Sequence, residues 1–218
     1  MGLFDIFHRA APIRDAAELA EFIDQRAAFL TQKGIFEYAR ARAGHYAKVL
    51  FREPEFQAAS DVSRWRAYPI GLAMVAELAE GVLRPVAGDD RARQVEAIGA
   101  LVLAVFDRYP LPAALDADVW HRSRSELDHR LRLIGLHPPK WAKDVPEPYW
   151  ESYVELMPIH QKLRGPDAPT IRNYLRVTAV NIHDELTKRL DVRAVAISLR
   201  GEWTLPPLAS IPSAVAAN

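Results

Sequence analysis

The chain has 218 residues, of which 50% are hydrophobic and 26% are charged, a composition that suits one folded domain and argues against global disorder. Its 28 basic and 28 acidic side chains cancel, which argues against a protein dedicated to duplex nucleic acid, because such proteins usually carry a basic excess. Since the sequence contains no cysteine, disulfides, thiolate nucleophiles and cysteine-ligated metals are excluded.

The chain begins with a short apolar segment, residues 1–11. Its large apolar side chains are Leu3, Phe4, Ile6 and Phe7. Asp5 interrupts the run, which is too short for a secretory signal peptide, and the isoleucine at position 6 does not fit the myristoylation pattern. Residues 2–9 resemble short amphipathic membrane-binding helices, such as the amphibian peptides that begin GLFDI and the membrane-targeting ends of some bacterial division proteins. The resemblance implies binding to a membrane surface. The alternative is burial against the protein itself.

Apolar residues recur at intervals of three and four along residues 14–200, which predicts an all-α domain. The predicted helices cover residues 14–32, 35–51, 56–83, 90–108, 116–134, 148–163 and 169–190. Gly34 separates the first two, and Pro69 predicts a kink or a break in the third, because proline removes an internal helical hydrogen bond. The apolar run 97–106 has about half the length that a bilayer crossing requires, so it predicts a buried helix.

Proline-rich stretches mark the predicted connections. Residues 136–148 contain four prolines and predict an ordered, irregular connection pinned by Trp141. The sequence GPDAP at 165–169 predicts a turn. Residues 192–199 fit either a helical extension or one short strand, and residues 201–218 predict a flexible tail. We therefore predict a single bundle of six or seven helices between the N-terminal segment and this tail.

The sequence contains no serine-esterase elbow, dinucleotide-binding loop, phosphate-binding loop or zinc-protease motif, and we predict no cofactor. One metal-like pair is present, because Glu126 and His129 lie three residues apart on a predicted helix. Helical di-iron sites use two such pairs, and no other glutamate here has a histidine three residues later. The alternative is that Glu126 pairs with Arg130, and Asp128 with Arg132, in surface ion pairs.

A histidine near a carboxylate is also a candidate acid–base couple. His121 and His129 share one stripe of a predicted helix, and His183 directly precedes Asp184. The candidate catalytic residues are therefore His121, Glu126, His129, His183 and Asp184. The alternative is that the carboxylates form ordinary i,i+4 surface pairs, Asp184 with Lys188 and Glu185 with Arg189.

The predicted helix 35–51 and the residue that follows it carry a run of basic side chains with no acid after Tyr38. The basic residues are Arg40, Arg42, Lys48 and Arg52, with Tyr38 and Tyr46 interleaved. A basic face with aromatic residues predicts contact with phosphate, anionic lipid or an acidic partner. The alternative is that the arginines pair with acids of a neighbouring helix, namely Glu77 and Glu80.

These features predict a non-catalytic helical adaptor or assembly protein that binds a protein partner or an anionic membrane, in the cytoplasm or at the inner face of a membrane. Burial of the four large N-terminal side chains contributes about 6–12 kcal/mol. Ordering the segment costs a comparable amount, so membrane binding needs the basic helix as a second contact. One alternative is a small all-α enzyme, a hydrolase or oxidoreductase, that uses the histidines and carboxylates with or without a metal. Another is a homo-oligomer that buries the N-terminal segment on a neighbouring copy.

Overall fold

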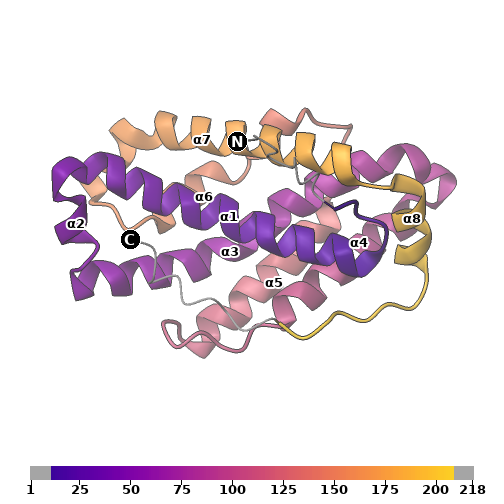
Figure 1. The fold of residues 1–218 in the computed structure, drawn as a ribbon, viewed down its shortest axis with the longest axis horizontal. Helices are drawn as coiled ribbons and strands as arrows, with labels where there is room; N and C mark the ends of the chain where they lie inside the picture. The colour runs from indigo at the N-terminus through magenta and orange to yellow at the C-terminus, as the bar shows by residue number, and fades with distance from the viewer. Residues whose placement is uncertain (1–10, 209–218) are drawn as a thin grey trace, which may run out of the picture.

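The computed structural model describes residues 11–208, and over this range the chain forms an all-α bundle (Figure 1). The long helices are α1 (Ala16–Ala43), α3 (Pro54–Leu83), α4 (Arg91–Asp107), α5 (Ala117–Leu133) and α7 (Gln161–Arg189). The shorter ones are α2 (Ala47–Leu50), α6 (Trp150–Leu156) and α8 (Val192–Arg200). The predicted fold class is confirmed, with seven helices of seven or more residues beside the single turn of α2 in the described range. No helix in that range has the length and apolarity needed to cross a membrane.

Helix α3 forms the centre of the bundle, because every residue from 67 to 80 is buried. It packs against α1, α4, α5, α6 and α7, and its closest partner is α1. The two helices approach each other at Gly71, where an added β-carbon would lie 2.8 Å from the backbone oxygen of Ala27. Removal of the apolar side chains of α3 and its neighbours from water is the main force that holds the bundle together.

Helix α1 continues through Gly34, so the break predicted there is wrong. Gly34 instead allows two tyrosine side chains to pack closely against α1. It is buried, and an added β-carbon would lie 2.7 Å from Cε1 of Tyr174 and would also collide with Tyr153. Helix α3 is likewise continuous through Pro69, so the possible break at that residue is absent. Tertiary packing outweighs the weak local preference of single residues in both helices.

Helix α7 begins eight residues earlier than predicted and runs through Pro166 and Pro169, so the turn predicted at 165–169 is wrong. Each proline removes only one backbone donor. The carbonyl groups that lose these donors belong to Lys162 and Gly165, both of which are exposed, so water can replace the missing hydrogen bonds.

The C-terminal part of the chain packs against the bundle. Residues 192–199 are helical in α8, and Asp191 caps this helix by accepting a hydrogen bond from the backbone nitrogen of Ala194 at 3.1 Å. Residues 201–208 are extended, and Trp203 and Leu205 pack half-buried against the core. The rest of the predicted tail, residues 209–218, lies outside the described residues.

Candidate functional site

The structure does not gather the predicted histidine and carboxylate residues. His121, Glu126 and His129 are exposed on α5, whereas half-buried His183 and exposed Asp184 lie on α7. These two helices occupy opposite sides of the bundle (Figure 1). Within residues 11–208 no three histidine or carboxylate side chains are placed to hold a metal ion. The Glu126–His129 pair therefore has no third protein ligand in that range.

Most of the alternative surface pairs do form. Nζ of Lys188 lies 2.5 Å from Asp184, Nη1 of Arg189 lies 2.6 Å from Glu185, and Nη2 of Arg132 lies 3.0 Å from Asp128. The predicted pair between Glu126 and Arg130 is absent from the described residues, since Arg130 stacks against the ring of Tyr149 instead.

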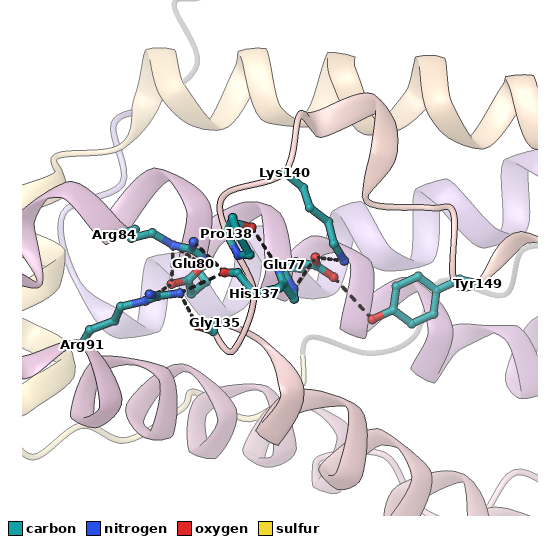
Figure 2. A network of polar contacts seen from close by, with 9 residues as sticks. All are labelled: Glu77, Glu80, Arg84, Arg91, Gly135, His137, Pro138, Lys140 and Tyr149. Carbon is teal, nitrogen blue, oxygen red and sulfur yellow. Dashed lines mark hydrogen bonds and ion pairs between the residues drawn. The ribbon is translucent and has the colours of Figure 1, made fainter.

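Two buried glutamates of α3 form a different polar site (Figure 2). Glu77 is 6% exposed and Glu80 is 0% exposed, and the two lie one helical turn apart on the same side of the helix. A buried carboxylate costs several kcal/mol of free energy unless it is paired and hydrogen-bonded. Both glutamates are paired in this way, and their partners are side chains of residues that follow α3 in the sequence.

Glu80 binds two arginines. The guanidinium group of Arg84 makes a forked contact with it, with Nε 2.9 Å from Oε1 and Nη2 2.5 Å from Oε2. Nε of Arg91 lies 3.6 Å from the same carboxylate. Both arginines also donate to the backbone of the next connection, Arg91 to the carbonyl oxygen of Gly135 and Arg84 to that of His137 at 3.1 Å (Figure 2).

Glu77 binds the far end of the same connection. Nζ of Lys140 donates to its Oε1 at 2.7 Å, and Nε2 of His137 lies 3.2 Å from that oxygen (Figure 2). The hydroxyl group of Tyr149 donates to Oε2 at 3.5 Å. Burial, together with the charge of Glu77, raises the pKa of Tyr149, so this hydroxyl group keeps its proton and remains a donor.

The two glutamates therefore hold residues 135–141, which we name the anchored loop. The loop leaves α5 at Gly135, whose φ of 88° favours glycine, and Pro138 and Pro139 restrict its middle. Because His137 and Lys140 turn toward Glu77, their neighbours face solvent. Leu136 is 77% exposed and Trp141 is 78% exposed. The prediction that Trp141 pins this connection by burial is wrong, since Glu77 and Glu80 hold it instead.

The prediction that Glu77 and Glu80 pair with the basic helix is also wrong, because their partners belong to residues 84–149. Sequence reasoning missed the role of both residues. One signal was available, since two acids spaced by three interrupt the apolar stretch 70–83. Such acids in a buried helix indicate paired charges.

The basic residues predicted to bind anions lie in and around α2, at one end of the bundle (Figure 1). Arg42 is paired, with its Nε 3.0 Å from Oδ2 of Asp167 on α7. Tyr38 donates to the same carboxylate, and burial together with Asp167 raises the pKa of Tyr38 to about 12. Tyr38 and Arg42 thus tie α1 to α7.

The other basic residues remain exposed, and within the described chain none of them has a carboxylate oxygen within 4.0 Å. Tyr46 and Val49 lie among them and are 63% and 54% exposed. We name this set the corner surface, which comprises Arg40, Tyr46, Lys48, Val49 and Arg52. The predicted membrane contacts Leu3, Phe4, Ile6 and Phe7 lie outside the described residues.

A third buried carboxylate, Asp24 of α1, lies below the surface among aromatic side chains. It accepts hydrogen bonds from the hydroxyl groups of Tyr68 at 2.6 Å and Tyr109 at 2.8 Å, and Nη2 of Arg108 lies 2.7 Å from its other oxygen. Burial raises the pKa of Asp24, although these partners oppose the rise. The cluster joins α1, α3 and the end of α4, which is a structural role.

The chain matches no model of a protein family, no curated protein and no solved structure.

Proposed function

We propose that this protein is a non-catalytic adaptor that binds an apolar segment of a partner protein through the anchored loop. The observation that carries the proposal is the exposure of Leu136 and Trp141, at 77% and 78%, on a segment whose intervening residues bind buried glutamates. Large apolar side chains on a restrained segment are typical of binding hot spots, and tryptophan is enriched among them.

Preorganisation supports this role. Ordering a flexible loop on binding costs about 0.5–1.5 kcal/mol for each immobilised side chain, and a loop that is already held in place avoids part of that cost. Exposed Leu133, at the end of α5, and Leu136 extend the apolar area beyond Trp141. Leu136 also lines a groove between α4 and α5, whose walls include Val95, Leu103 and Leu131. A partner segment that covers Leu136 would reach this groove.

Site-specific photo-crosslinking tests the partner interaction. A photo-reactive residue at position 141 of the full chain, in the cells that produce the protein, is expected to give one discrete adduct. The same residue at position 197 is the control, because Ile197 on α8 is similarly exposed but distant from the loop in sequence. The substitution Glu77→Gln weakens the attachment of the loop and should reduce the adduct. Equal crosslinking at both positions would contradict the proposal.

A second function, association with an anionic membrane, is favoured by the corner surface. Tyr46 and Val49 project among three exposed basic side chains, a combination typical of interfacial contacts. Each basic residue near an anionic surface contributes about 1 kcal/mol. Full burial of an apolar side chain contributes about 1.5–3 kcal/mol. The resulting affinity is moderate and reversible, and the N-terminal segment would increase it.

Co-sedimentation with vesicles tests membrane association. We expect the full chain to bind vesicles that contain phosphatidylserine at low salt, and to ignore vesicles of phosphatidylcholine alone. Changing Arg40, Lys48 and Arg52 to glutamate should abolish binding, and deleting residues 1–10 should weaken it. The matched control changes three exposed basic residues elsewhere, Arg93, Arg132 and Arg193, to glutamate. If both triple variants lose binding equally, net charge and not the corner surface is responsible.

A further inference from the structure

A cleft of about 370 Å³ lies between α3, α5 and α6, and its lining contains no residue of the anchored loop or of the corner surface. Ile70, Leu127 and Leu156 give it apolar walls. Three arginines also line it. Arg66 comes from α3, and Arg122 and Arg130 come from α5. The volume falls within the range of small-molecule sites, which combine apolar walls with a few polar groups.

None of the three guanidinium groups forms an ion pair within the described part of the chain. Within residues 11–208, no carboxylate oxygen lies within 4.0 Å of any of them, although Glu126 and Glu155 line the same cleft. This differs from Arg84, which forms a short ion pair with Glu80. The cleft therefore has cationic groups available for an external anion.

The position of Arg130 is set by the network of the anchored loop. Its guanidinium carbon lies 5.0 Å from the centre of the Tyr149 ring, and the Tyr149 hydroxyl group donates to buried Glu77 (Figure 2). A cation stacked on an aromatic face keeps its charge and its in-plane donors. Arg122, Glu126 and Arg130 follow one another at four-residue spacing along α5, so their side chains lie in one row.

We propose that this cleft binds a small amphiphilic organic anion, whose carboxylate or phosphate group contacts the arginines and whose apolar part packs on Ile70 and Leu156. Arginine suits this ligand because its planar fork of donors matches carboxylate and phosphate oxygens. Glu126, named from the sequence as a metal or catalytic residue, has a different role here. With Glu155 it places negative charge at the cleft, and this charge repels highly charged anions more strongly than singly charged ones.

Titration calorimetry with phenyl phosphate and benzoate as probes tests the site. At least one probe should bind saturably, and more tightly than inorganic phosphate and neutral benzyl alcohol at equal ionic strength. Binding of phenyl phosphate alone assigns a phosphate ligand, and binding of benzoate alone assigns a carboxylate ligand. Amide chemical-shift changes should fall on residues of the cleft, such as Ser123 and Leu127, and not on the corner surface.

Two single variants, Arg66→Gln and Arg122→Gln, should each weaken binding about tenfold or more, because each removes a charge-assisted contact. Arg66 and Arg122 are exposed residues, so the fold should survive these changes. Circular dichroism checks that it does. Arg132→Gln is the matched control, since Arg132 is on the same helix but lines the groove toward α4. The proposal is overturned if neither probe binds, if benzyl alcohol binds equally well, or if Arg132→Gln weakens binding as much.

Discussion

Lys140 donates a hydrogen bond to Glu77 across 63 positions of the sequence, with 2.7 Å between Nζ and Oε1. This contact joins a buried position of the central helix to a surface connection that contains two adjacent prolines. It thereby determines which side chains of the connection face inward and which face solvent.

The two buried glutamates should differ in their contribution to stability. Loss of one partner from a buried pair costs about 3–5 kcal/mol, and Glu80→Gln should approach that cost because Arg84, its forked partner, is also largely buried. Glu77→Gln should cost less, since Lys140 and His137 are partly exposed and can regain water. Chemical denaturation measures both, with Glu96→Gln on the exposed surface of α4 as the control.

Hydrogen exchange separates the local effect of Glu77→Gln from its global effect. Amide protection across the anchored loop should fall in this variant, while protection in the middle of α3 should be retained. A variant whose loop exchanges as slowly as that of the native protein would show that Glu77 does not hold the connection.

Two glycines of α3 should respond oppositely to alanine. Gly71→Ala should destabilise the protein by about 1–3 kcal/mol, because the new methyl group meets the backbone of Ala27, which cannot move aside easily. Gly81→Ala should stabilise it by up to about 1 kcal/mol, since nothing lies within 4 Å of an added β-carbon there and alanine favours helix. Thermal unfolding of both variants measures the contrast. Equal shifts would mean that α1 and α3 are not in close contact at Gly71.

The raised pKa of Asp24 predicts a pH dependence of stability. An acid whose pKa in the folded state lies above its usual value near 3.8 binds its proton more tightly when the protein is folded. Its contribution to stability is therefore complete below the unfolded pKa and is lost as the pH rises through the folded pKa. Asp24→Asn cannot titrate, so its unfolding free energy should lack this decline in the region just above pH 3.8. Parallel pH profiles for the two proteins would contradict the assignment.

The exposed side chains of the anchored loop should contribute little to folding. Leu136→Ser and Trp141→Ser should each change the unfolding free energy by less than about 0.5 kcal/mol, because both side chains are already in water. Each should also shorten retention on a hydrophobic-interaction column. Ile134→Ala is the matched control, because Ile134 is buried directly before the loop and its truncation should cost about 2–5 kcal/mol. A large loss of stability in Trp141→Ser would show that the side chain is buried.

The positions of the helices could be predicted from the sequence where apolar residues recur at regular intervals. Helices α4 and α5 begin and end within one residue of their predicted ranges, because capping and stop signals such as Gly135 act locally. The continuity of α1 through Gly34 and of α7 through Pro166 could not be predicted from the sequence. Glycine and proline weaken a helix by an amount that long-range packing can outweigh, and a single sequence does not reveal that packing.

The sequence by itself determined an all-α domain and placed a run of basic residues at 40–52, since helical periodicity and charge runs are local properties of the chain. Only the tertiary structure decided the partners of charges that lie far apart in the sequence. Glu77 binds Lys140 and His137, Arg42 binds Asp167, and the arginines of the α3–α5–α6 cleft bind no carboxylate in the described range. The physical reason is that the energy of an ion pair depends on distance and burial, and both are set by how the helices pack.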